Sequence, residues 1–394
     1  MKHCTSRFLP EDNCSGLLLC RIWSTWDIPG PSVAVVREDG VYDLSQRFGS
    51  MSCLLDMEDP AAAVRATSGR RVDSLEAILA NSEESSRDDE KPNFLSPCDL
   101  QVIKAAGVTF AASMIERVIE EKAGGDASRA REIRRQVESQ IGNDLAAIKP
   151  GSPQAAHLKE ALQSQGIWSQ YLEVGIGPDA EVFTKAPVLS TVGTGSTIGI
   201  RSDSRWNNPE PEVVLAVNST GKIVGASLGN DVNLRDIEGR SALLLGKAKD
   251  NNASCAIGPF IRLFDASFGL DDVRNAEVHL HVLGADGFVL EGINSMNQIS
   301  RDPLDLVQQV MQCHQYPDGF MLFLGTLFAP TQDRDAEGAG FTHKLGDRVS
   351  IHSKHLGTLT NTVSYCELAA PWRFGLRAFF QNLSSRSLPI GYLP

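Results

Sequence analysis

The strongest constraint on the fold of this 394-residue chain is a β-hairpin pattern that gathers three carboxylates at one end. Two runs of β-branched, apolar and small residues, at 213–217 and 223–228, suit paired strands. Glu210 and Glu212 are two residues apart at the start of the first run, so on a strand both side chains leave the same face. Asp231 follows the second run, at the same end of the expected hairpin.

The turn of this hairpin sets how its strands pair. Asn-Ser-Thr-Gly at 218–221 is a turn signal between the two runs. If Val217 pairs near Lys222, then Glu210 lies opposite Gly229, with the aspartate just beyond. The three carboxylates therefore converge.

Three converging carboxylates predict a site for a hard divalent cation. Oxygen ligands favour Mg²⁺, Mn²⁺ or Ca²⁺ over zinc or copper, and three protein ligands leave positions open for water and substrate. The alternative is a solvated acidic hairpin end. We expect Mg²⁺ as cofactor, with Mn²⁺ or Ca²⁺ able to substitute.

The segments that follow support the metal site. Lys249 and the Ile-Gly-Pro segment at 257–259 come after the three carboxylates, followed by Glu-Gly-Ile-Asn-Ser-Met-Asn-Gln at 291–298, Gly-Thr at 325–326 and Leu-Gly-Asp-Arg-Val at 345–349. In this order the chain resembles the fumarylacetoacetate hydrolase superfamily, over roughly residues 98 to 370. The short spacing from Glu212 to Asp231 is most similar to the sugar-acid branch, the 2-keto-3-deoxy-pentonate dehydratases.

The pattern of elements predicts an α+β fold. Short β runs follow position 180, with peripheral helices, and the resemblance implies a mixed β-roll or sandwich catalytic domain. A charged run ending in proline, at 81–92, predicts a boundary between a smaller N-terminal α/β domain (1–97) and a catalytic domain (98–394). Further predictions are a hairpin at 32–43 and helices at 61–79, 111–147, 153–163 and 303–315.

The resemblance implies several roles in catalysis and substrate binding. A divalent ion chelated by an α-keto acid stabilises the enolate formed when a proton leaves the adjacent carbon. Lys249 aligns with the superfamily lysine that stabilises this enolate, with Lys247 as the fallback. Glu181 aligns with an acid/base glutamate of the dehydratase branch. Candidates for contacting the substrate are Thr326, Arg235, Lys185 and Ser113.

One difference from the pattern of the hydrolytic family members favours dehydration over hydrolysis. Hydrolytic members carry a histidine and a glutamate that activate water, whereas this chain has Ser113 at the histidine position and keeps Glu116 as a catalytic candidate. A serine without a partner is no general base near neutral pH. We therefore expect Mg²⁺-dependent dehydration of a 2-keto-3-deoxy-pentonate to 2,5-dioxopentanoate. The alternatives are an acylpyruvate-type carbon–carbon hydrolase and a metal-binding relative that has lost catalysis.

Composition limits the partners and the compartment. A net charge of -12 argues against nucleic acid, and the eight cysteines show no Cys-x-x-Cys pattern, which indicates reduced thiols in the cytoplasm. We expect neither a signal peptide nor a membrane span, and the resemblance implies a homo-oligomer, a dimer or tetramer. His279 and His281 alternate on an expected strand, where facing solvent or a partner is favoured over a two-histidine metal site.

Overall fold

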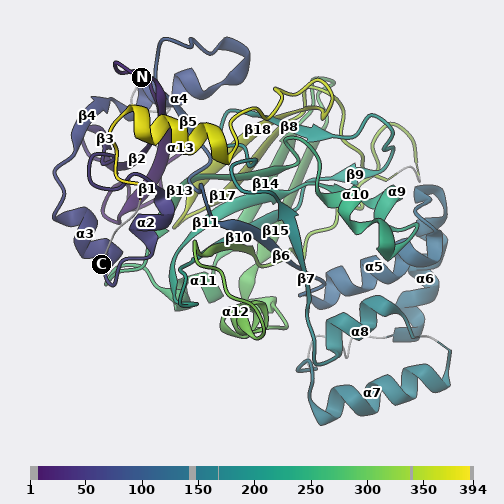
Figure 1. Ribbon diagram of the computed structural model, residues 1–394. Coiled ribbons are helices and arrows are strands. Elements are labelled where there is room, and N and C mark those ends of the chain that lie inside the picture. Colours follow the sequence, from purple (N-terminus) through teal and green to yellow (C-terminus); the bar gives the residue numbers. More distant parts are fainter. Residues whose placement is uncertain (1–7, 142–147, 167, 338–339, 391–394) are drawn as a thin grey trace.

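The structure is a computed structural model that describes residues 8–141, 148–166, 168–337 and 340–390. Two β-sheets form its centre, one group of helices lies at one end, and the C-terminal helix lies at the other, beside the N-terminal strands (Figure 1). This is the predicted α+β architecture. No helix among the described residues is long and apolar enough to cross a membrane.

The larger sheet runs through the whole molecule in the order β4-β3-β2-β1-β13-β11-β10-β16-β6-β7, with β5 paired to β1. It is largely antiparallel, apart from the parallel pair β16 and β6. Its strands are β1 (Leu18–Ser24), β2 (Gly30–Arg37), β3 (Gly40–Asp43), β4 (Arg70–Asp73), β5 (Asn93–Leu95), β6 (Val102–Gly107), β7 (Glu181–Ala186), β10 (Pro211–Val217), β11 (Ile223–Asp231), β13 (Cys255–Leu263) and β16 (Phe320–Phe323).

The smaller sheet covers one face of the larger one. Its order is β15-β14-β17-β18-β8, and a separate two-stranded ribbon joins β9 and β12. Along β14 every second residue is buried, and Val278, Leu280 and Val282 share one core with residues of β10 and β11. This period of two is what a sheet packed on one face requires. The bounds are β8 (Thr197–Ile200), β9 (Asn207–Asn208), β12 (Asn233–Leu234), β14 (Glu277–Leu283), β15 (Val289–Ser295), β17 (Arg348–Ser353) and β18 (Gly357–Tyr365).

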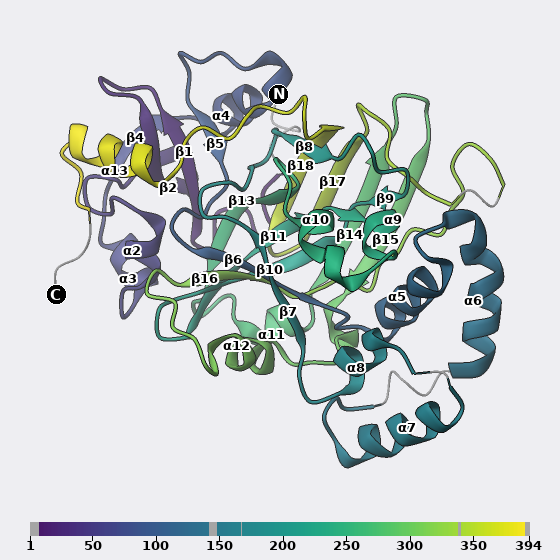
Figure 2. The ribbon, with the colours of Figure 1, turned by 45° about the vertical axis from the view of Figure 1, so that its right-hand side comes forward.

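Helices α5 to α8 form a layer with its own apolar core at one end of the sheets (Figure 2). The helices are α2 (Met51–Leu55), α3 (Pro60–Arg65), α4 (Leu75–Ser82), α5 (Ala111–Ala123), α6 (Ala127–Ile141), α7 (Pro153–Ser164), α8 (Gln170–Ile176), α9 (Arg235–Glu238), α10 (Leu245–Lys249), α11 (Leu270–Arg274), α12 (Pro303–Met311) and α13 (Leu376–Ser385). Short 3-10 helices occur at Glu84–Ser86, Ala242–Leu244 and Met296–Gln298.

The predicted hairpin at 210–231 forms, but its register differs from the prediction. Glu212, not Glu210, lies opposite Gly229, and the amide of Asp231 donates to the carbonyl of Glu210 at 3.1 Å. The cause is an irregularity beside Val217, which pairs with Ile223, so the strands slip by two residues relative to the prediction. A shift of two preserves the face of every side chain, and the carboxylates still converge.

Helix boundaries show further corrections. The predicted helix at 61–79 is interrupted by β4, because Gly69 takes a positive φ of 71° and turns the chain. The predicted helix at 111–147 breaks at Gly124 and Gly125, both of positive φ, and its last six residues lie outside the described part. The hairpin at 32–43 and the helices near 153–163 and 303–315 are confirmed.

The N-terminal residues extend the larger sheet rather than forming a sheet of their own. Leu18 and Leu19 of β1 pair with Arg262 and Ile261 of β13. The C-terminal helix α13 packs beside these strands, where Asn382 donates to the carbonyl of Pro29 at 2.8 Å. A domain boundary between residues 97 and 98 stays a prediction.

Candidate metal centre

The open end of the β10–β11 hairpin brings the three predicted carboxylates together. Glu210, Glu212 and Asp231 each offer an oxygen, and these oxygens lie within 4.8 Å of one another. All three residues are buried, with exposed fractions of 7%, 2% and 2%. Glu212 is anchored by the amide of Gly325, which donates to its Oε2 at 2.6 Å. Gly325 has a φ of 88°, a conformation that favours glycine.

The charge balance of this cluster fits a divalent cation. No ion pair to Glu212 occurs within the described part of the chain, whereas Asp231 is paired with Lys249 and Lys185. Burial raises the pKa of Glu212 well above its ordinary value, and the neighbouring Asp231 and Glu210 raise it further. Buried carboxylates that lack partners are costly, and a bound cation removes that cost. An all-oxygen donor set suits a hard ion.

Lys249, at the end of α10, points into this cluster. Its Nζ lies 2.5 Å from Glu210 Oε2 and 3.2 Å from Asp231 Oδ2. Burial lowers the pKa of Lys249, but the two carboxylates outweigh it, so the pKa is raised and the ammonium stays charged. The fallback candidate Lys247 points outward instead, 3.6 Å from Asp203 and half exposed.

Lys185 contacts Asp231 and Lys249 without lining the cavity. Its buried Nζ hydrogen-bonds to the carbonyl of Lys249 and to Ser254 Oγ, and lies 3.2 Å from Asp231 Oδ1. Lys185 does not line the cavity at the carboxylates, so these contacts position Asp231 and Lys249 rather than reach a ligand.

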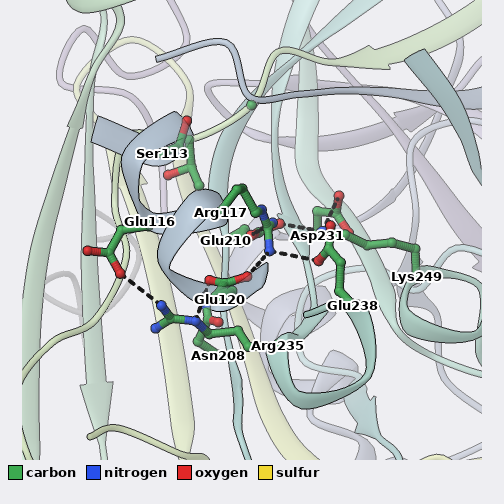
Figure 3. A network of polar contacts seen from close by, with 12 residues as sticks. Ser113, Glu116, Arg117, Glu120, Asn208, Glu210, Asp231, Arg235, Glu238 and Lys249 are labelled. Carbon is green, nitrogen blue, oxygen red and sulfur yellow. Dashed lines mark hydrogen bonds and ion pairs between the residues drawn. The ribbon is translucent and has the colours of Figure 1, made fainter. Parts of the chain in front are cut away.

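Arg117 of α5, a residue that the sequence patterns did not single out, connects the helical layer to the metal centre (Figure 3). Its Nη2 donates to Glu210 Oε1 at 2.8 Å, while Nη1 donates to Glu120 Oε2 at 2.8 Å and to Glu238 Oε2 at 2.7 Å. Glu210 is thereby held on one oxygen by Arg117 and on the other by Lys249. One available signal was Glu120, a charged residue at a buried position of an amphipathic helix.

Two predicted site residues are engaged in ion pairs with each other. Arg235 Nη2 donates to Glu116 Oε2 at 2.9 Å and Arg235 Nε to Glu120 Oε1 at 2.6 Å, and the guanidinium lies 4.2 Å from the Trp206 ring centre. Arg134 binds both oxygens of Glu116, at 2.9 and 2.6 Å. In this structure the buried Arg235 links α9 to α5, and the charge of Glu116 is compensated by two arginines.

Ser113 and Thr326 both line the cavity beside the carboxylates. Ser113 Oγ donates to the carbonyl of Phe110 at 2.9 Å and accepts from its amide at 3.3 Å, which caps the start of α5. Thr326 Oγ1 accepts from the amide of Phe328 at 3.1 Å, which leaves its hydroxyl hydrogen available.

Glu181, at the start of the edge strand β7, lines the same cavity. A Cβ on Gly107 would lie 2.2 Å from its Oε2, so glycine makes room for this carboxyl. Burial raises the pKa of Glu181, outweighing Arg117 and Lys249, which lower it. A carboxyl that binds a proton more readily than usual suits proton transfer.

Comparison with known proteins assigns the family. A family described as "Fumarylacetoacetate (FAA) hydrolase C-terminal" matches residues 155–364, more than half of the chain. The protein belongs to this family, as the sequence motifs predicted.

Two curated relatives are sugar-acid dehydratases. The chain is 32% identical over 183 residues to 2-dehydro-3-deoxy-D-arabinonate dehydratase of Saccharolobus solfataricus, covering 46% of this chain and 58% of that one. It is 31% identical over 194 residues to a probable 2-keto-3-deoxyxylonate dehydratase of Haloferax volcanii, covering 49% and 63%. The matched segments thus span about three fifths of these relatives.

Solved structures support the fold. A 2-keto-3-deoxy-D-arabinonate dehydratase complexed with magnesium and 2,5-dioxopentanoate superposes with a TM-score of 0.61 at 21% identity, covering 88% of this chain and 99% of that one. A fumarylacetoacetate hydrolase from Exiguobacterium antarcticum superposes with a TM-score of 0.51 at 16% identity, covering 89% and 99%.

Proposed function

We propose that this protein is a Mg²⁺-dependent dehydratase that converts a 2-keto-3-deoxy-pentonate into 2,5-dioxopentanoate. The observation that carries the proposal is the buried carboxylate triad, with Lys249 in contact with Glu210 and Asp231 and with Glu181 lining the same cavity. The dehydratase relatives and the magnesium complex of a protein of similar fold support the same reaction. The triad would hold Mg²⁺, which would act as a Lewis acid and favour negative charge on the keto oxygen of the substrate.

The side chains around the triad would supply charge stabilisation, proton transfer and substrate binding. Lys249 supplies a fixed positive charge beside the developing negative charge, and its location away from water makes that charge effective. Glu181 takes the proton from C3 and returns a proton to the departing C4 hydroxyl, so that one water leaves. This elimination leaves a double bond between C3 and C4. A proton then leaves C5 while another adds at C3, which gives the C4–C5 enol, and ketonisation of this enol by protonation at C4 gives the C5 aldehyde. Thr326 offers a hydroxyl to the substrate carboxylate.

The wall formed by α5 favours elimination over hydrolysis. The hydroxyl of Ser113 is committed to the cap of its own helix, and Glu116 is paired with Arg134 and Arg235. Neither group is placed as a free base for an attacking water. Dehydration needs no such water, whereas cleavage of an acylpyruvate does.

Three variants assayed on two substrates test the proposal. Wild-type protein with Mg²⁺ is given 2-keto-3-deoxy-pentonate or an acylpyruvate, and products are identified by mass. Glu181→Gln should lower kcat for dehydration by about 10² to 10⁴, since it removes a proton-transfer group. Ser113→Ala should keep appreciable turnover, and Glu116→Gln is the matched carboxylate control.

The opposite pattern would reject the dehydratase. Efficient cleavage of acylpyruvates that depends on Glu116 but not on Glu181, with the deoxy-keto acids untouched, identifies a carbon–carbon hydrolase. No turnover of any keto acid would identify a relative without catalysis.

We also propose that the enzyme is a cytoplasmic homo-oligomer, a dimer or a tetramer. Cysteines in the described part of the chain are unpaired, as expected of reduced thiols. The outer face of the smaller sheet exposes Leu283, Val289 and Ile293 by 42% to 47%, which suits contact with a second copy. Light scattering should give the mass of two or four chains, and a monomer would contradict it.

A further inference from the structure

Two asparagines line the same cavity as the metal centre and are not part of the mechanism above. Asn208 and Asn233 lie opposite each other on the two-stranded ribbon of β9 and β12. Directly opposed residues of an antiparallel pair project to the same face, with Cβ atoms about 5 Å apart. Their side chains are buried, with exposed fractions of 2% and 1%.

Both carboxamide oxygens lack a hydrogen-bond donor within the described residues. For Asn208 the orientation is fixed, because its Nδ2 donates to the carbonyl of Pro209 at 2.9 Å and leaves Oδ1 as the free end. A buried acceptor without a donor destabilises a folded protein, and native proteins keep such groups where water or a ligand completes them.

The cations that line the cavity do not serve these oxygens. Lys249 is engaged with Glu210 and Asp231, whereas Arg117 and Arg235 are engaged with glutamates. The missing donors must therefore come from a ligand or from water. A neutral carbonyl oxygen accepts a hydrogen bond from a hydroxyl group but cannot donate one to an anion. This part of the cavity therefore suits hydroxyl groups of a ligand rather than its carboxylate.

We propose that Asn208 and Asn233 form a diol subsite that accepts hydrogen bonds from the C4 and C5 hydroxyls of the substrate. The inference rests on the proposed function and deepens it, because two neighbouring acceptors match two vicinal hydroxyl donors. A 2-keto acid without hydroxyl groups leaves both oxygens unsatisfied. The subsite therefore selects polyhydroxy keto acids over simple ones of the same length.

The test compares two acids with the same carbon skeleton. 2-Keto-3-deoxy-pentonate carries both hydroxyls, and 2-oxopentanoate carries neither. Asn208→Ala and Asn233→Ala should each lower kcat/KM for the hydroxylated acid about tenfold, equivalent to about 1.4 kcal/mol. The inhibition constant of 2-oxopentanoate and the affinity for Mn²⁺, measured by calorimetry, should both stay within about twofold of wild type.

Asn207→Ala is the matched control, since Asn207 is the adjacent buried asparagine of β9. Its Oδ1 accepts from the amide of His343 at 3.2 Å and its Nδ2 donates to Ser204 Oγ at 3.2 Å. This variant should lower the melting temperature while keeping the preference for the hydroxylated acid. If Asn233→Ala does not fold, Asn233→Leu, which is similar in size and has no acceptor, takes its place with the same expectation.

Each other outcome decides against the subsite or against the reaction. Equal losses for both acids would overturn the subsite, and a loss of Mn²⁺ affinity would make the amides metal ligands instead. If wild-type protein does not dehydrate the hydroxylated acid, calorimetry measures its binding directly. A preference over 2-oxopentanoate that depends on Asn208 then keeps the subsite and rejects the dehydratase, whereas no preference rejects the subsite.

Discussion

Two buried groups of charged side chains differ in how completely their carboxylates are paired. In the Arg334 cluster, Asp347 is bound on both oxygens by Arg334, at 2.7 and 2.9 Å, and by His343 Nδ1 at 3.0 Å. At the candidate metal centre, Glu210 is paired with Lys249 and Arg117, and Asp231 with Lys249 and Lys185. Glu212 has no ion pair among the described residues.

The pKa values of Asp347 and Glu212 are shifted in opposite directions, because only Asp347 is fully paired. Burial raises the pKa of Asp347, but hydrogen bonds from His343 and Arg334 outweigh it and hold the pKa at about 2. Burial and two carboxylate neighbours raise the pKa of Glu212 instead. Burial alone therefore does not show what a charged cluster does. Asp347 has its charge compensated within the protein, whereas the pairing of Glu212 is incomplete, as expected of a site that takes up a cation.

Of the changes that distinguish the two clusters, removal of the metal should have the largest effect, and this effect is on activity. Removal of the ion with EDTA should abolish dehydration, a loss of at least about 10³-fold, because no protein group can replace the metal ion as a Lewis acid. Mg²⁺ or Mn²⁺ should restore activity, and Ca²⁺ tests how far a larger ion is accepted. Glu212→Gln should weaken Mn²⁺ binding in calorimetry without lowering the melting temperature. Full activity of metal-free protein would contradict the assignment of the centre.

Asp347→Ala should act on stability and leave metal binding alone. Removing Asp347 leaves the buried Arg334 with Asp286 as its remaining carboxylate partner, and we expect a cost of about 3–5 kcal/mol in the free energy of unfolding. Urea denaturation measures this loss. The control is Asp335→Ala, because Asp335 is a largely exposed partner of Lys344 and should change stability by less than about 1 kcal/mol. Similar stability of the two variants would show that the Arg334 cluster is not structural.

Lys249→Met should reduce kcat by about 10² to 10³, with a smaller change in KM. The reason is the loss of a charge held 2.5 Å from Glu210 in a buried site. Lys247→Met is the control of equal chemistry on the outer side of α10, and it should be mild. If Lys247→Met is the more damaging change, the structure places the wrong lysine at the carboxylates.

Acid should weaken the Arg334 cluster by a smaller amount. The folded-state pKa of Asp347 is about 2, below the ordinary value of 3.8, so its stabilising effect is complete above about pH 4. It is lost as the pH falls from about 4 through 2, when the carboxylate is protonated, and amounts to about 2 kcal/mol. The unfolding free energies of wild type and Asp347→Asn should therefore converge over this range. A constant difference between them would contradict the low pKa.

The convergence of the three candidate metal ligands was predictable because they are local in sequence. Glu210, Glu212 and Asp231 belong to one hairpin, and a strand period of two brings them together even though the register was two residues out. Lys249 follows shortly after, within a recognisable motif. The resemblance also indicated the fold, which a domain-sized match and solved structures now support.

The rest of the site depends on contacts between distant segments. Arg117 comes from α5, Glu238 from α9 and Asn208 from β9, and no sequence spacing relates them. The positive φ at Gly69 and Gly124 likewise breaks helices whose apolar periodicity continues through the break. Which arginine reaches which carboxylate is set by tertiary packing, so Arg235 and Glu116 could be singled out but their mutual ion pair could not be foreseen.

The irregularity beside Val217 makes the length of a distant turn a constraint on the chemistry. The turn at 218–221 closes the hairpin at the end opposite to Glu210 and Asp231, and the pairing that starts there determines what faces what at the carboxylates. Inserting or deleting a single residue in the turn, without a second irregularity that absorbs it, would shift β11 by an odd number and turn Asp231 to the other face of the sheet. In evolutionary terms, turn length here should be inherited as strictly as the three carboxylates themselves, although the turn lies at the other end of the hairpin.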